Sequence, residues 1–77
     1  MMKIEILGTG CPKCKKLFEN TREAVKVINL DAEVVKEEDI QKIIQSGVMM
    51  TPALVVDGKI LSSGKILSVD EIKKILK

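Results

Sequence analysis

The sequence predicts an α/β fold with the element order βαβαββα, that is, a four-stranded mixed sheet with three helices. One observation is an isoleucine-rich run at residues 2–7, followed by a long stretch of helical periodicity and then by a second β-branched run. Another is Asp57-Gly58 between two apolar runs, which is a strong signal for a type I′ hairpin. A third is the length of 77 residues, which suits one domain, so we expect residues 1–77 to form a single domain.

The first predicted elements are a strand and a long helix. Residues 2–7, MKIEIL, alternate as a strand does, and Gly8-Thr9-Gly10 breaks the strand with a loop. Pro12 fits the first helical position, where its missing N–H has no partner in any case, so Cys11 is expected at the N-cap. The helix is predicted to run to about Asn29 on an apolar stripe of Cys14, Leu17, Phe18, Thr21, Val25 and Ile28. Cys14 therefore lies on the buried stripe and Cys11 at the helix tip, which makes the two thiols inequivalent.

The second half of the βαβ unit is a short strand at residues 31–36, DAEVVK. A strand, a long helix and a second strand imply parallel pairing and a right-handed crossover. A short second helix is predicted from about Glu38, with Gly47 at its C-terminal cap, on the apolar residues Ile40, Ile43 and Ile44.

The remaining elements are a hairpin and a final helix. The runs ALVV and KILSS flank Asp57-Gly58, and Ser68-Val69-Asp70-Glu71 has the form of a capping box that opens a helix. The inward face of that helix is predicted to comprise Val69, Ile72, Ile75 and Leu76.

The only two cysteines, Cys11 and Cys14, are separated by two residues, and three explanations compete. A bridge across so short a loop adds about 2 kcal/mol of stability, against about 4.7 kcal/mol for a 100-residue loop, so a structural disulfide is a weak explanation. A structural zinc site wants four Cys or His ligands, and the chain has no histidine. A second copy of the chain or carboxylates could complete such a set, so this alternative stays open. A redox pair explains the spacing best, provided that the fold agrees.

Composition excludes several other functions. A net charge of +2 with interspersed signs, together with a single aromatic residue, provides neither an electrostatic footprint nor a stacking platform for nucleic acid. The start, MMKIEIL, is too short and too charged for the apolar part of a signal peptide, and no run reaches membrane-spanning length. We therefore expect a cytoplasmic protein, in which such a cysteine pair is kept mostly reduced and is catalytic rather than structural.

The position of Cys11 suits a nucleophile. A cysteine at a helix N-terminus has a lowered pKa, and it is the thiolate that attacks a disulfide. Lys13, Lys15 and Lys16 place positive charge in the first turn, where helices ordinarily prefer acids. These lysines either favour the thiolate of Cys11 or are simply solvated side chains. For Lys15 and Lys16, the solvated side chain is the favoured explanation.

The order βαβαββα, with Cys11-Pro12-Lys13-Cys14 after the first strand and Thr51-Pro52 before the hairpin, resembles a minimal thioredoxin fold. Within that superfamily the chain is similar to the small archaeal and bacterial thioredoxin-like redox-active disulfide proteins. Its proline lies second in the motif, as in glutaredoxins, and Gly10 replaces the tryptophan of thioredoxins. Only part of the glutaredoxin Gly-Gly-Asp segment remains, as Ser63-Gly64-Lys65, and Lys13 stands where glutaredoxins carry an aromatic residue. The sequence therefore does not support glutathione as the cosubstrate.

The resemblance implies a thioredoxin- or glutaredoxin-like disulfide reductase with Cys11 and Cys14 as its catalytic residues. Pro52 would be a cis-proline beside the cysteines, and the backbone of Thr51 would pair with an extended substrate, with Lys13 and Gly10 also at the substrate site. We expect no cofactor and no metal. The expected partners are client proteins with disulfides and a thioredoxin-reductase-like electron donor, and the expected state is a monomer.

Two further assignments compete with simpler explanations. In thioredoxins, a buried acid six residues before the first cysteine helps deprotonate the second, and Glu5 has that offset. A half-exposed strand would give the same alternation. Met49, Met50 and Phe18 could form an apolar platform for partners, but core or loop packing is the commoner role.

The main rival function is soft-metal binding or transfer. GTGCPKCKK after a first strand also resembles short copper-chaperone domains, whose order is βαββαβ, and two thiolates suit Cu(I). That order ends on a strand, whereas EIKKILK is predicted to be a helix, and this difference favours the redox function.

Overall fold

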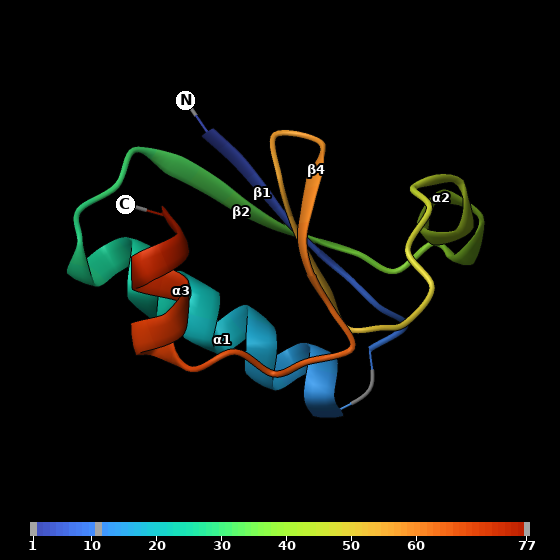
Figure 1. The fold of residues 1–77 in the computed structure, drawn as a ribbon, viewed down its shortest axis with the longest axis horizontal. Coiled ribbons are helices and arrows are strands. Elements are labelled where there is room, and N and C mark those ends of the chain that lie inside the picture. Colours follow the sequence, from blue (N-terminus) through green and yellow to red (C-terminus); the bar gives the residue numbers. More distant parts are fainter. Residues whose placement is uncertain (1, 11, 77) are drawn as a thin grey trace.

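The computed structural model describes residues 2–10 and 12–76, and these form a four-stranded sheet with three helices (Figure 1). The elements in chain order are β1 (Met2–Leu7), α1 (Pro12–Val27), β2 (Ala32–Glu37), α2 (Ile40–Gln45), β3 (Ala53–Val56), β4 (Lys59–Ser63) and α3 (Val69–Leu76). The order βαβαββα and the minimal thioredoxin fold are thus confirmed.

The sheet has the strand order β2-β1-β3-β4. β1 and β2 are parallel, as the crossover through α1 predicts, and β3 is antiparallel to both β1 and β4. Leu7 is paired with Glu37 on one side and with Ala53 on the other. The carboxyl ends of β1 and β2 therefore meet the beginning of β3 at one edge of the sheet.

Apolar side chains fill both faces of the sheet. On one face, Ile4 and Ile6 of β1 pack with Leu17 of α1 and Ile72 of α3, and Figure 1 shows these two helices lying together below the strands. On the other face a smaller cluster joins Leu7, Ala53 and Val55 to Ile43 of α2. Residues at alternate positions of β1 thus belong to opposite faces.

The local capping signals act as predicted. Asp57 and Gly58 both have positive φ, at 50° and 83°, as a type I′ turn requires. In the capping box, the backbone N–H of Ser68 donates to Glu71 Oε1 at 3.1 Å, and the N–H of Glu71 donates to Ser68 Oγ at 3.1 Å.

Two helix boundaries differ from the sequence prediction. α1 ends at Val27 rather than near Asn29, because Asn29 itself takes a left-handed backbone with φ of 54°. α2 begins at Ile40 rather than near Glu38, because Asp39 caps it and accepts the N–H of Gln41 at 2.9 Å.

The predicted apolar faces need three corrections. In α3, Ile72 and Leu76 are buried and Val69 packs against the core, but Ile75 remains 39% exposed. In α2, only Ile43 is buried, while Ile40 and Ile44 are 58% and 68% exposed. In α1, the fully buried stripe includes Ala24, which the prediction omitted, whereas Phe18, Val25 and Ile28 are only partly buried.

Candidate active site

Those predicted site residues that the structure describes lie around the edge of the sheet where β1 and β2 end. The N–H of Gly8, just beyond β1, donates to the carbonyl of Glu37 at the end of β2, at 3.0 Å. α1 starts four residues after Gly8, and Thr51-Pro52 immediately precedes β3 on the other side of β1. The loop after β1, the start of α1 and the start of β3 therefore meet at this edge.

Cys14 lies in the first turn of α1 and is buried, with 6% of its surface exposed. Gly8 packs directly against it, since a Cβ built on Gly8 would overlap the Cys14 sulfur and lie 3.1 Å from the Cys14 Cβ. The same Cβ would lie 3.8 Å from the Cβ of Thr51. Gly8 is thus the point at which Cys14 and Thr51 come together, and any side chain there would displace the thiol.

Cys11 lies outside the residues that the structure describes. α1 begins at Pro12, as predicted, so Cys11 directly precedes the first helical residue in the sequence. Lys13 is exposed in that first turn, and Gly10 is exposed with a positive φ of 87°. The assignment of Cys11 as the nucleophile therefore remains a prediction from the sequence.

The Thr51–Pro52 peptide bond is cis, as predicted, with Pro52 buried and Thr51 exposed. The end of β4 fixes this loop. The N–H of Gly64 donates to the Pro52 carbonyl at 2.9 Å, and the Ser63 hydroxyl donates to the Met50 carbonyl at 3.0 Å. A Cβ on Gly64 would lie 3.1 Å from the Met50 Cβ, so the missing side chain of Gly64 allows the end of β4 to pack closely against Met50.

Two residues that the sequence analysis did not select, Lys36 and Glu38, lie beside Cys14. They line a cavity of about 110 Å³ together with Ile6, Gly8, Gly10, Cys14 and Lys15. Glu38 reaches over the loop after β1, because its Oε2 would lie 2.8 Å from a Cβ on Gly10. For Glu38, which follows β2 directly, the predicted parallel pairing of the two strands was a signal, since groups just beyond the carboxyl ends of adjacent parallel strands share one edge of a sheet.

Glu5 is not brought to Cys14. It lies on the face of β1 that carries Leu7, in a depression lined by Val55, Lys42 and Glu37. Cys14 lies in α1, which covers the opposite face with Ile4 and Ile6. The acidic side chain that lines the cavity at Cys14 is Glu38.

The methionines next to the cis-proline are not core residues. Met49 is 94% exposed and Met50 is also exposed, so of the two packing roles, core or loop, core packing is ruled out for both, and Met50 lies close to Gly64 in the loop. Phe18 is partly buried and packs against the main core. The three residues therefore do not form one platform.

The described part of the chain contains no group of three or more histidine, cysteine or acidic side chains arranged to hold a metal ion. Within the same residues, no helix is both long and apolar enough to cross a membrane.

Comparisons with known proteins agree with this geometry. The profile of the thioredoxin domain family matches residues 2–77. A protein named thioredoxin from Methanothermobacter thermautotrophicus is 47% identical over 76 residues, covering 99% of each chain. Another thioredoxin, from Methanocaldococcus jannaschii, is 47% identical over 77 residues, covering all of this chain and 88% of its own length.

A weaker match involves a protein of another name, a triosephosphate isomerase from Methanothermus fervidus. It is 35% identical over 78 residues, but these are only 32% of its length, so nothing about isomerase activity follows. The family profile and the two full-length relatives define the class. The chain belongs to the thioredoxin family and is a thiol–disulfide oxidoreductase.

Proposed function

We propose that this protein reduces disulfides of client proteins or small molecules through the pair Cys11 and Cys14. The observation that carries the proposal is the burial of Cys14 in the first turn of α1, against Gly8 and next to Thr51 and cis-Pro52. A shielded thiol one helical turn from a thiol at the helix start suits a resolving cysteine paired with an attacking one.

The reaction begins when the Cys11 thiolate attacks one sulfur of a client disulfide. The client S–S bond breaks, a mixed disulfide forms, and the departing client thiolate takes a proton from solvent. Cys14 then loses its proton and attacks the Cys11 sulfur, which releases the second client thiol and leaves a Cys11–Cys14 disulfide. The client gains two electrons and two protons, and a thioredoxin-reductase-like donor returns them to the protein.

The substrate would lie between the start of α1 and the cis-proline loop. In this proposal the exposed Thr51 offers its backbone to an extended client segment, while the buried Pro52 sets the direction of that backbone. Lys13 and Gly10 are both exposed near the start of α1, and in this proposal Lys13 favours the anionic thiolate while the client chain passes over Gly10.

Soft-metal transfer through the same two cysteines is the weaker candidate. The observed order βαβαββα, in which β3 and β4 form a hairpin followed by α3, differs from the βαββαβ order of the copper-chaperone domains that the motif resembles.

The proposed function is tested by a redox titration of the Cys11/Cys14 pair combined with insulin reduction using alternative donors. We expect a two-electron transition, together with insulin reduction that depends on a thioredoxin-reductase-type donor and is not supported by glutathione. Absence of a two-electron transition, or insulin reduction unaffected by Cys11→Ser, would contradict the proposal.

A further inference from the structure

A second surface adjoins the Cys14 cavity on the side away from cis-Pro52. Two adjoining depressions of about 620 and 380 Å³ lie between α1 and β2 and share Phe18, Arg22 and Lys26. We call them the α1–β2 groove. The larger one shares Lys15 and Lys36 with the cavity at Cys14, so the groove leads to the buried thiol.

We propose that the α1–β2 groove binds an extended acidic segment of a protein whose disulfide this enzyme exchanges. This inference rests on the proposed function and adds the chemistry of the partner. The groove lies on the β2 side of β1, whereas Thr51-Pro52 lies on the β3 side, so one partner can occupy both surfaces at once.

The charge of the groove favours an anionic ligand. Four exposed cations line it against two carboxylates, those of Glu19 and Glu23. Among the residues described by the structure, the ion pairs are Lys42–Glu37 and Lys73–Asp70, which involve none of these four cations. The charges available to a ligand are therefore those of Lys15, Arg22, Lys26 and Lys36.

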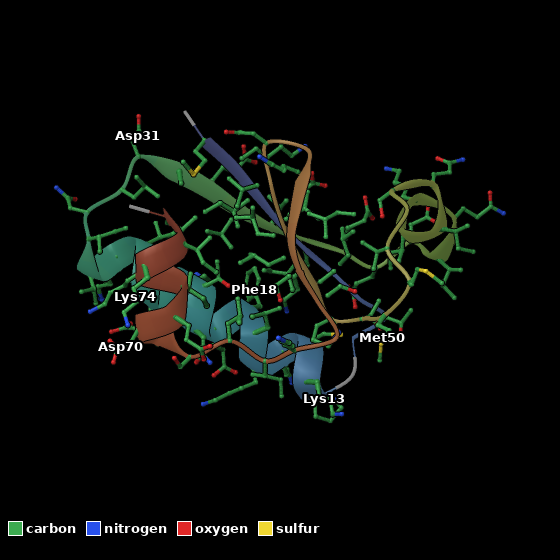
Figure 2. All side chains as sticks on the ribbon, viewed as in Figure 1. Lys13, Phe18, Asp31, Met50, Asp70 and Lys74 are labelled. Carbon is green, nitrogen blue, oxygen red and sulfur yellow. The ribbon has the colours of Figure 1, made fainter. Side chains whose placement is uncertain are left out.

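Phe18 holds two of these cations in place. The Lys36 Nζ lies 4.6 Å from the centroid of its ring, and the Arg22 guanidinium carbon lies 5.7 Å from it. Both distances are within the range of cation–π attraction. Figure 2 shows Phe18 extending from α1 toward the strands, where it forms part of the apolar floor of the groove. Cations held over one ring lose little side-chain entropy when they pair with an acid.

The length of the groove suits a short extended segment. Its wall on β2 runs from Ala32 in one depression to Lys36 in the other, a distance of about 13 Å at the usual strand rise. About four residues of an extended peptide span that length. The groove combines apolar side chains such as Val25 and Val34 with the basic side chains of α1 and Lys36, which fits a segment in which acidic and apolar side chains alternate.

The test uses three synthetic disulfide peptides that differ only in four residues flanking one cysteine, which are glutamates, glutamines or lysines. At low salt we expect kcat/KM to be about tenfold higher for the acidic peptide than for the neutral one, as two or three exposed ion pairs would provide. The preference should shrink at 0.5 M salt, because exposed charges are then screened.

Matched variants locate the effect. The double variant Arg22→Gln, Lys26→Gln removes two groove cations distant from the cysteines and should abolish most of the acidic preference. The control, Lys59→Gln with Lys74→Gln, makes the same change in net charge at exposed positions on β4 and α3 and should retain it. An equal loss in the control would mean that net charge alone steers the peptide, and would overturn the proposal.

Other outcomes separate this inference from the proposed function. If all three peptides are reduced at the same rate, the proposal that the α1–β2 groove binds an acidic segment is contradicted, while the proposed reductase function is not affected. If no peptide is reduced, binding is measured instead with a cysteine-free acidic peptide, by the changes in backbone NMR shifts of residues 15–36. Shift changes in this range support binding in the α1–β2 groove, and their absence contradicts it. Shifts caused by inorganic polyphosphate but not by that peptide would assign the groove to phosphate ligands and overturn the proposal.

Discussion

At the scale of single residues, the absence of a side chain at Gly8 brings the buried thiol against the loop after β1. We predict that Gly8→Ala lowers the free energy of unfolding by about 1–3 kcal/mol, because the new methyl group overlaps the Cys14 sulfur in a packed site. The substitution should also slow the step in which Cys14 attacks the mixed disulfide, because the sulfur must move. Urea denaturation and stopped-flow measurement of mixed-disulfide resolution check the two effects.

Gly47→Ala is the matched control. No atom lies within 4 Å of a Cβ built there, but its φ of 87° costs an alanine about 1–2 kcal/mol. Stability should therefore fall by a comparable amount without any change in thiol kinetics. If Gly8→Ala resolves mixed disulfides at the wild-type rate, the contact with Gly8 does not govern Cys14.

The second residue-level prediction concerns the different roles of the two cysteines. Cys14 is almost fully shielded, whereas Cys11 precedes the first helical residue, where a thiol pKa is lowered. A brief pulse of iodoacetamide at mildly acidic pH should therefore label Cys11 first, as measured by mass spectrometry. Cys14→Ser should accumulate mixed disulfides with clients, and Cys11→Ser should be inactive and trap little. Label found mainly on Cys14 would reverse the assignment of the nucleophile.

The acids near the site show what a sequence can and cannot predict about single residues. Burial of Cys14 followed from helical spacing, and that prediction is confirmed. The offset of Glu5 from Cys11 suggested a partner for the thiol, yet strand alternation places Glu5 on the opposite face of the sheet. Glu38 reaches the site only because β2 is parallel to β1 and ends beside it. Its place beside the cavity depends on how β1 and β2 pair, which the spacing of residues along the chain does not reveal.

At the scale of elements, the capping box of α3 makes a pH-dependent contribution to stability. The pKa of Glu71 is lowered, chiefly by the hydrogen bond from the Ser68 N–H and next by the Ser68 hydroxyl, with Lys65 and Lys74 adding smaller effects. A carboxylate whose pKa is depressed in the folded state stabilises the fold above its unfolded pKa of about 4.3, and this contribution is lost as pH falls through the folded value.

We therefore predict that Glu71→Gln is less stable than wild type at pH 7 and that the difference narrows below about pH 4. Chemical denaturation at a series of pH values measures it. Glu33→Gln, at an exposed position on β2, serves as the control, and its free energy of unfolding should change with pH as that of the wild type does. A constant difference between wild type and Glu71→Gln from pH 3 to pH 7 would show that the carboxylate charge is not involved in the cap.

Local chemistry predicted the elements better than it predicted their apolar faces. The Asp57-Gly58 turn and the Ser68–Glu71 cap depend on neighbouring residues alone, and both form as expected. Ile44 and Ile75 continue apolar stripes but stay exposed, because no other element of the described chain covers them. Periodicity defines a stripe, whereas the packed neighbours determine how much of it is buried.

At the scale of the whole molecule, the parallel pairing of β1 with β2 and the antiparallel entry of β3 together build the site. Leu7 lies between Glu37 and Ala53, so the loop after β1 is flanked by the cavity wall on one side and by cis-Pro52 on the other. The helix crossover returns the chain over the face that carries Ile4 and Ile6, with Cys14 in its first turn. The site thus requires the complete sheet rather than the Cys-x-x-Cys motif alone.

The last prediction is that folding requires no metal. Core residues on both faces of the sheet are fully buried, including Ile4 and Ile72 on one face and Ala53 on the other, so apolar packing rather than a metal cross-link holds the elements together. Protein treated with a chelator and a reductant should keep its circular dichroism spectrum and its Tm.

Zinc should bind weakly at most, with an affinity that falls as pH is lowered, because two thiolates must lose their protons to bind it. The Cys11→Ser, Cys14→Ser double variant controls for binding elsewhere and should lose even this affinity. Metal-free protein that is unfolded and regains its structure on addition of zinc or Cu(I) would rank metal transfer above disulfide reduction. Unchanged folding with a two-electron redox transition would instead leave both thiols available for exchange with client disulfides.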